Sequence, residues 1–305
     1  MTTTSANGVD IDYRFDGPAG GPVILLIMGL AQQLIFWPDD FIAALNEAGY
    51  RTLRFDNRDI GHSQKFAGRR APNPMVQLAA RLAGIRGLAP YALEDMAKDT
   101  AGLLDALAIE AADVIGVSMG GMIAQVLAAK HPRRVKRLAI IMSSTNNPKL
   151  PRARAEIAKA LMAAPANVLT KEQALERAMY LWNLIGTKNA GASEEELRAR
   201  LAAAYERSHY PAGARRQLAA IIETGDLRRQ FTRKIAAPTL VIHGSEDPLA
   251  PPAGGVDIYK NIKGADLEII EGMGHDIPKK FRARIAARIV GHFKGSERRA
   301  GPSLP

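Results

Sequence analysis

Ser118 lies in the sequence GVSMGG, whose residue types and spacing are those of a nucleophile site. The pattern G-x-S-x-G places a serine on a tight turn between a strand and a helix. Gly116 and Gly120 lack Cβ atoms, so the helix can pass close to the strand and the serine can adopt an unfavourable backbone conformation. A strand-like segment at 113–117 precedes the serine, and a helix-like segment at 120–130 follows it. We therefore favour a nucleophilic Ser118 over a glycine-rich turn without chemistry.

A serine hydroxyl needs a base, and the base needs an acidic group that orients it. With G-x-S-x-G the partners follow in the order serine, acid, histidine. His275 follows the strand-like segment 267–270 within the sequence GMGH, where a base late in the chain is expected. His243 lies only four residues before the best acid candidate, so we expect it to pack locally. The remaining histidines are less suitably placed: His62, His131, His209 and His292.

Asp247 is the best candidate for the acid. It lies in the sequence GSEDP, directly after a strand-like segment at 239–243. Pro248 restricts the turn, which favours Asp247 over the neighbouring Glu246. The segment after the preceding strand, 143–145, contains no carboxylate. The alternative is that Asp247 only caps a helix or a turn.

Acyl transfer also needs hydrogen-bond donors for the developing oxyanion. The backbone N–H of Met119, the residue after the serine, is one expected donor. The second is expected from the loop after the apolar run 23–28, and we assign it to the backbone of Leu30. The alternative is that Met28 and Leu30 are core residues without this role.

Strand-like and helix-like segments alternate along the chain, which predicts an α/β fold with a mostly parallel sheet flanked by helices. The strand-like segments are 10–15, 23–28, 50–55, 113–117, 135–142, 239–243 and 267–270. The helix-like segments between and after them are 41–48, 93–107, 120–130 and 281–292. The connection 64–90 is long and contains its own helix-like piece at 75–82.

Residues 147–235 contain several helix-like segments and no convincing strand. We therefore expect a core domain made of 1–146 and 236–305, with an inserted helical cap at 147–235. Within the cap, large apolar residues recur at near-helical spacing: Tyr180, Leu181, Trp182, Leu184 and Ile185, of which we single out Tyr180 and Trp182. They are candidates for a substrate pocket, although such residues also commonly form a cap's own core.

The composition excludes several classes of site. The chain has 305 residues and no cysteine, which rules out disulfides, thiolate metal sites and cysteine nucleophiles. It contains no phosphate-binding loop, no dinucleotide fingerprint and no H-E-x-x-H sequence. We therefore expect no metal and no cofactor.

The net charge of +10 could indicate a nucleic-acid or membrane partner. The basic excess lies in 146–236 and 276–305 and is not interleaved with aromatic residues, so a solvated surface is favoured over nucleic-acid binding. The longest apolar run, 23–30, is too short to span a bilayer. The N-terminus shows no signal peptide, and a cytoplasmic location without a membrane partner is expected. The oligomeric state is left open.

Taken together, these motifs resemble the α/β-hydrolase superfamily, and within it the aclacinomycin methylesterase group of cofactor-free serine esterases. They are LIMGL at 26–30 with WPD at 37–39, DNRDIGHS at 56–63, the GVSMGG turn, EDPLAPP at 246–252 and EGMGHDIP at 271–278. The resemblance implies a nucleophilic Ser118, with Asp247 and His275 as its partners and Leu30 and Met119 as oxyanion donors. Many relatives have His-Gly where this chain has Met28-Gly29, but the methylesterase group also carries methionine there.

The expected function is a carboxylic ester hydrolase acting on small to medium apolar esters through a Ser-His-Asp triad. The same triad also serves cofactor-free perhydrolases (haloperoxidases) and carbon–carbon bond hydrolases, which remain alternatives. A ligand sensor with slow turnover is an alternative from a different class.

Overall fold

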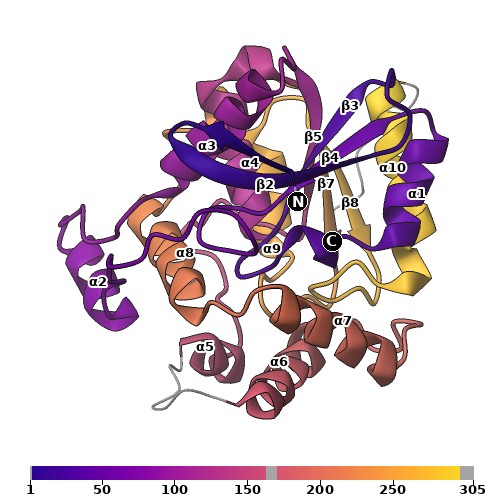
Figure 1. Cartoon of the computed structure of the whole chain (residues 1–305). Helices are drawn as coiled ribbons and strands as arrows, with labels where there is room; N and C mark the ends of the chain where they lie inside the picture. Colours follow the sequence, from indigo (N-terminus) through magenta and orange to yellow (C-terminus); the bar gives the residue numbers. More distant parts are fainter. Residues whose placement is uncertain (1, 163–169, 296–305) are drawn as a thin grey trace.

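Eight strands of the described chain form one sheet in the order β1-β2-β4-β3-β5-β6-β7-β8 (Figure 1). The computed structural model describes residues 2–162 and 170–295. The β1/β2 and β2/β4 pairs are antiparallel, and the other pairs are parallel. The strands are β1 (Thr2–Ala6), β2 (Val9–Asp16), β3 (Val23–Ile27), β4 (Arg51–Phe55), β5 (Ala112–Val117), β6 (Val135–Ile141), β7 (Thr239–Gly244) and β8 (Asp266–Ile270).

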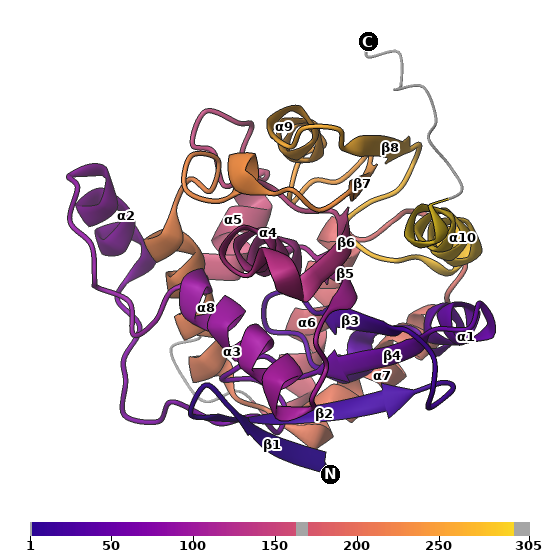
Figure 2. The same ribbon diagram turned by 90° about the horizontal axis from the view of Figure 1, so that it is seen from above.

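Helices cover both faces of the sheet, which is why its central strands are almost continuously apolar (Figure 2). One face packs against α1 (Asp39–Glu47) and α10 (Arg282–Lys294). The other packs against α3 (Leu93–Ala106), α4 (Met119–Lys130) and α9 (Ala253–Asn261). The predicted α/β fold, a mostly parallel sheet flanked by helices, is thus confirmed.

Four helices lie between β6 and β7 in the described residues, at the carboxyl end of the parallel strands (Figure 1). They are α5 (Ala155–Met162), α6 (Lys171–Ile185), α7 (Glu194–Arg207) and α8 (Pro211–Thr224). We call residues 147–235 the cap. Its helices α6 and α7 share a small apolar cluster formed around Leu175, Met179 and Leu201.

The long connection after β4 contains α2 (Pro74–Leu82), as the sequence predicted. Asn73 caps this helix by accepting hydrogen bonds from the backbone N–H groups of Met75 and Val76. Short 3₁₀ helices complete the fold: η1 (Leu34–Phe36), η2 (Pro132–Arg134), η3 (Thr232–Lys234) and η4 (Lys279–Phe281). Among the described helices, none is both long and apolar enough to cross a bilayer.

Two elements were absent from the sequence prediction. β1 has the sequence TTTSA, which lacks apolar alternation, and it is an edge strand that pairs only with β2. α9 contains Gly254 and Gly255, which are poor helix formers. A Cβ at Gly255 would lie 2.6 Å from Nδ1 of His243, so the close packing of α9 on β7 requires glycine there.

Candidate active site

Ser118 occupies a strained turn between β5 and α4. Its backbone has φ 53° and ψ −121°, a conformation that is unfavourable for a residue with a side chain. A Cβ at Gly116 would lie 2.5 Å from the carbonyl oxygen of Gly120. A Cβ at Gly120 would lie 2.0 Å from the carbonyl oxygen of Ile27. Both glycines are thus required by close backbone contacts, which is the reason inferred from the sequence.

The structure brings together the three side chains expected to form a triad. His275 Nε2 lies 2.9 Å from Ser118 Oγ, and His275 Nδ1 lies 2.7 Å from Asp247 Oδ2. Oδ1 of Asp247 accepts the backbone N–H groups of Leu249 and Ala250 at 3.0 and 2.8 Å. Both carboxylate oxygens of the acid therefore face donors. The chain of contacts can move a proton from the serine to the histidine while the carboxylate holds the other ring nitrogen.

The electrostatics of Asp247 favour its ionised form. Burial by itself raises the pKa of this carboxyl, but the neighbouring His275 and hydrogen bonds from both His243 and His275 lower the pKa well below its usual value. Glu246, the competing acid candidate, is exposed. Asp247 is thus an anion at neutral pH, as a group that orients a histidine must be.

His243 is buried next to the same acid but serves a local contact. Its Nε2 lies 2.7 Å from the carbonyl oxygen of Ala250 and 3.4 Å from Asp247 Oδ2. The local packing expected for His243 from the sequence is confirmed. It steadies the turn that carries Asp247.

The loop after β3 lies against the serine. A Cβ at Gly29 would be 3.3 Å from Cβ of Ser118. Ala31, with φ 61°, donates its N–H to Oε1 of Gln217 in α8 at 2.9 Å. Leu30 is half-buried and packs against the apolar core, so its side chain fits a core role while its backbone belongs to the loop beside Ser118.

Met119 is the first residue of α4. The N–H groups of a helix's first turn have no acceptor within the helix, and the helix dipole makes this end favourable for negative charge. The N–H groups of Gly121 and Met122 point back to the carbonyl oxygen of Ser118. The start of α4 is thus a suitable place for an oxyanion donor.

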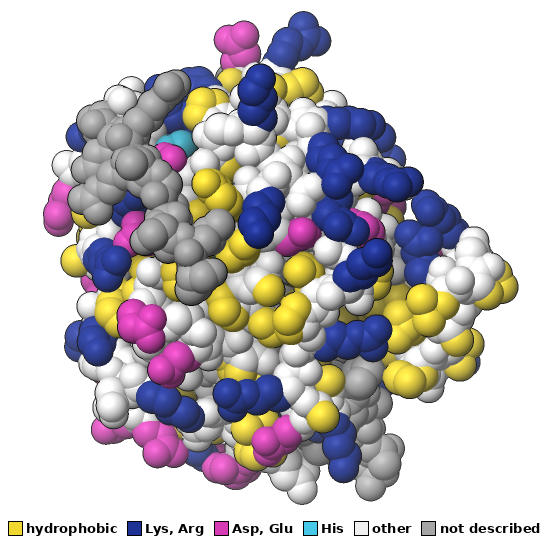
Figure 3. Space-filling view, turned by 180° about the vertical axis from the view of Figure 1, so that it is seen from behind, with side chains coloured by type: hydrophobic (Ala, Val, Ile, Leu, Met, Phe, Trp, Pro, Cys, Tyr) yellow, Lys and Arg dark blue, Asp and Glu magenta, His cyan; other side chains and the backbone are white. Residues whose placement is uncertain are grey.

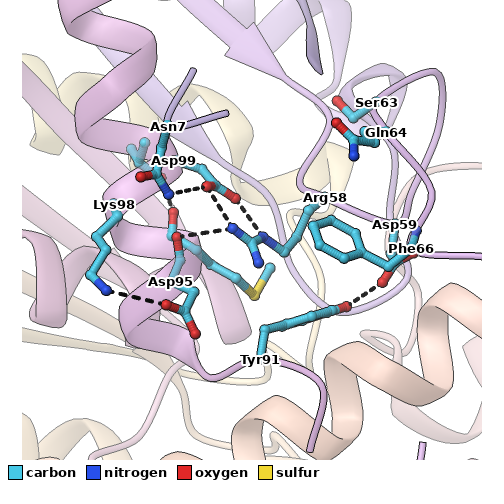
Figure 4. Close-up of polar contacts among 12 residues, drawn as sticks. Asn7, Arg58, Asp59, Ser63, Gln64, Phe66, Tyr91, Asp95, Lys98 and Asp99 are labelled. Carbon is cyan, nitrogen blue, oxygen red and sulfur yellow. Dashed lines mark hydrogen bonds and ion pairs between the residues drawn. The ribbon is translucent and has the colours of Figure 1, made fainter. Parts of the chain in front are cut away.

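A buried ion pair fixes the loop 56–63, which carries the motif DNRDIGHS (Figure 4). The guanidinium of Arg58 donates to both carboxylate oxygens of Asp99 at 2.5 and 2.6 Å. It also lies over the rings of Phe66 and Tyr91. Burial raises the pKa of Asp99 above its usual value despite this partner. The pair fixes the loop against α3.

Two arginines of the cap bind carboxylates of the core. Arg216 of α8 makes two hydrogen bonds to Asp59, at 2.7 and 2.8 Å. Although burial raises the pKa of Asp59, the Arg216 hydrogen bonds and its other donors lower it below the ordinary value. Arg207 of α7 lies 2.6 Å from Asp12 and 2.7 Å from Asp56. These ion pairs fix the cap over the loop 56–63.

The cap also holds the loop that carries His275. Ile185, the last residue of α6, accepts the backbone N–H of His275 at 2.8 Å. Thr187 Oγ1 accepts the N–H of Gly274 at 2.8 Å and donates to Asp276 at 2.5 Å. Burial raises the pKa of Asp276. None of these contacts was anticipated, because the cap residues Ile185 and Thr187 lie in no recognisable motif.

The two aromatic residues proposed from the sequence as pocket candidates lie in different surroundings. Tyr180 is half exposed, and its hydroxyl donates to Glu156 on the cap surface at 2.7 Å. Trp182 packs with the cap's apolar cluster and stacks on Phe36, with ring centroids 6.3 Å apart. Trp182 therefore lies where the cap meets η1, and Tyr180 lies on the outer surface of the cap.

A cavity of about 340 Å³ lies between cap and core, next to the acid. Asp247, Gly274, Thr187 and Leu184 contribute to its wall. Ser118, Tyr180 and Trp182 do not. Within residues 2–162 and 170–295 there is no group of three or more His, Asp or Glu side chains that could hold a metal ion.

Comparison with known proteins places this geometry in a family. A family model described as the alpha/beta hydrolase fold matches residues 22–279. Rhodomycin D methylesterase DauP of Streptomyces sp. (strain C5) is 28% identical over 299 residues, which cover 92% of this chain and 93% of that protein. A putative carbamate hydrolase, RutD of Variovorax paradoxus, is 27% identical over 266 residues, covering 87% and 89%. The methylesterase match confirms the resemblance that the sequence motifs indicated.

Solved structures show the same fold. The enol-lactonase of Burkholderia xenovorans LB400 superposes with a TM-score of 0.72 at 24% identity, covering 96% of this chain and all of that one. A hydrolase of Pseudomonas aeruginosa PA01 gives the same TM-score at 25% identity, covering 96% and 97%. The family match, the sheet order and the serine turn agree, and the chain belongs to the alpha/beta hydrolase family as one of its enzymes.

Proposed function

We propose that this enzyme is a carboxylic ester hydrolase with Ser118 as nucleophile, His275 as base and Asp247 as the orienting acid. The observation that carries the proposal is the unbroken chain of contacts from Asp247 to His275 to Ser118, with the serine on a strained turn. The similarity to rhodomycin D methylesterases supports an ester as the substrate class.

In the first half of the reaction, Ser118 Oγ attacks the ester carbonyl carbon while its proton passes to His275 Nε2. The carbonyl oxygen becomes an oxyanion, which the backbone N–H groups of Leu30 and Met119 stabilise. The tetrahedral intermediate collapses, the alcohol leaves with the proton from His275, and the acyl group stays on Ser118.

In the second half, His275 takes a proton from a water molecule, whose oxygen attacks the acyl carbonyl. The second tetrahedral intermediate breaks its bond to Ser118 Oγ, which recovers its proton from His275. The products are a carboxylic acid and an alcohol. Asp247 stays ionised throughout and stabilises the imidazolium form of His275.

We also propose the division into a core of 1–146 and 236–305 and a cap of 147–235. The four described helices between β6 and β7 and the apolar cluster shared by α6 and α7 support this division, while Ala220 of α8 packs in the main core.

Labelling and kinetics of one variant test the function. Ser118→Ala should lose ester hydrolysis almost completely, since loss of one triad member can cost about 10⁶ in kcat. A fluorophosphonate should label the wild type on Ser118 and should fail to label the variant. Ser143→Ala is the matched control, because Ser143 Oγ donates to the carbonyl oxygen of Ser118 at 2.7 Å without joining the triad. It should still be labelled.

A panel of p-nitrophenyl esters of increasing acyl length, together with methyl esters of aromatic acids, would define the substrate. Activity should survive treatment with EDTA, because the proposed mechanism uses no metal. Normal turnover by Ser118→Ala would refute the proposed mechanism.

A further inference from the structure

Residues 75–88 expose a cluster of large apolar side chains to solvent. Five of the six markedly exposed large hydrophobic residues in the described chain lie in this short stretch. They are Met75 (62% exposed), Val76 (61%), Leu82 (78%), Ile85 (55%) and Leu88 (41%). A contiguous exposed apolar cluster on a protein of this kind commonly marks an interaction site.

The cluster stands on a projection at the edge of the molecule. α2 extends away from the body beside α8 (Figure 1), and seen from behind its apolar side chains form the tip of the projection (Figure 3). Its inner side is fixed to the cap. Gln77 Nε2 donates to the carbonyl oxygen of Ala219 at 2.9 Å, and Arg81 donates to that of Thr224 at 3.1 Å. The apolar side is therefore held outward by polar contacts on the opposite side.

The projection is also basic. The chain from 65 to 91 contains Lys65, Arg69, Arg70, Arg81 and Arg86 and no Asp or Glu. Arg69, Arg70 and Arg86 are exposed. Glu223 of α8 approaches from the body, where its carboxylate accepts the backbone N–H groups of Gly87 and Ala89. An apolar tip thus stands among exposed arginines.

We propose that the projection formed by residues 65–90 binds the surface of anionic lipid membranes. Aliphatic side chains that enter the acyl region, next to arginines at the level of the phosphates, are the pattern of an interfacial element. A second copy of this chain fits less well, because two such projections facing each other would bring like charges together. Single-stranded nucleic acid also fits less well, since the tip is aliphatic and offers no aromatic ring for bases to stack on.

The proposed contact is peripheral, so it needs no helix that spans the bilayer. With nine residues, α2 is too short to be such a helix. It differs from the sequence-based expectation of no membrane partner, which rested on the length of the apolar runs and on the placement of the charges. It is independent of the proposed ester hydrolysis, because lipid binding is measured without turnover.

Cosedimentation of the full chain with vesicles tests the proposal. Vesicles of phosphatidylcholine with a third of phosphatidylglycerol should bind the protein, and vesicles of phosphatidylcholine alone should bind it at least about fivefold more weakly. Added salt should weaken the binding to the anionic vesicles, because exposed charges are screened. No binding to the anionic vesicles, or equal binding to both kinds, would overturn the proposal.

Variants locate the contact. Leu82→Ser combined with Ile85→Ser should lower the vesicle partition coefficient by at least about tenfold. Tyr180→Ser, which removes an exposed aromatic residue elsewhere, should leave it unchanged. Arg86→Gln should lower it about fivefold, whereas Arg133→Gln, an exposed arginine in η2 with the same change of net charge, should not. Equal loss in the targeted and control variants would refute this site.

Sedimentation velocity separates lipid binding from self-association. The protein should sediment as the same species with and without the Leu82/Ile85 substitutions. A dimer that is lost in the double variant would assign the apolar tip to a second copy and would contradict the proposal.

Discussion

Replacing Asp247 by asparagine tests the site most directly, because the surroundings dictate how the amide must lie. Oδ1 of Asp247 accepts two backbone N–H groups, at 3.0 and 2.8 Å, and an amide oxygen can keep both. The amide nitrogen then takes the place of Oδ2, 2.7 Å from His275 Nδ1. The reverse orientation would set the NH₂ group against two N–H donors.

The consequence is a change of tautomer. An NH₂ group that faces His275 Nδ1 requires this nitrogen to accept, so the ring proton moves to Nε2. Nε2 then points its proton at Ser118 Oγ and can no longer take the serine's proton. In a serine protease the equivalent change lowers kcat by about 10⁴, which corresponds to about 5 kcal/mol of barrier. We expect a loss of this size in Asp247→Asn.

The assay is the steady-state hydrolysis of a p-nitrophenyl ester, with thermal unfolding recorded to show that the variant is folded. Glu246→Gln is the matched control, since it removes one negative charge from the adjacent, exposed residue. It should keep most of the activity. A folded Asp247→Asn enzyme whose kcat stays within about tenfold of the wild type would refute the assignment of the acid.

Three further outcomes follow from other charged groups. Burial raises the pKa of Asp113 to about 6 from the ordinary 3.8, so protonation of this carboxyl stabilises the fold fully below pH 3.8, and the stabilisation is lost as the pH rises through 6. Asp113→Asn, whose side chain stays neutral, should therefore stabilise the fold at pH 8 by at most about 3 kcal/mol. Urea titrations should show this gain vanishing near pH 4. Arg216→Met leaves the buried Asp59 carboxylate without its ion partner and should cost about 3–5 kcal/mol in urea unfolding at pH 7. In esterase assays, kcat/KM should rise with pH along one ionisation, because a general base must be unprotonated to act, and a flat profile from pH 5 to 9 would contradict a histidine base.

The placement of the triad candidates was predictable because each rests on a local signal. Ser118 has a fixed pattern of glycines, and these glycines are required because a Cβ in the place of Gly120 would come within 2.0 Å of a backbone oxygen. Asp247 and His275 follow strands of a parallel sheet, whose carboxyl ends lie at one edge. Residues 157 and 28 positions apart therefore meet without any contact having to be known beforehand.

The ion pairs between cap and core were not predictable in the same way. Arg216 pairs with Asp59 across 157 residues, and Arg207 pairs with Asp12 across 195. The chain has 41 basic residues and 31 acidic ones, and no spacing rule selects these partners. The exposed apolar cluster at 75–88 was not predicted from the sequence for a related reason. Its apolar residues look like an ordinary amphipathic helix until the packing shows which side is covered.

Residues of the cap contact the loop that carries His275 and the loop beside Ser118. A cap that only shapes a pocket could vary freely without touching the chemistry. Here Ile185 and Thr187 hold the loop that carries His275, and Gln217 holds Ala31 in the loop beside Ser118. Residues of the cap therefore help to set the position of both the proposed base and the expected oxyanion donor. We infer that cap substitutions near these contacts alter kcat as well as substrate preference, whereas substitutions on its outer surface, such as at Tyr180, leave both unchanged.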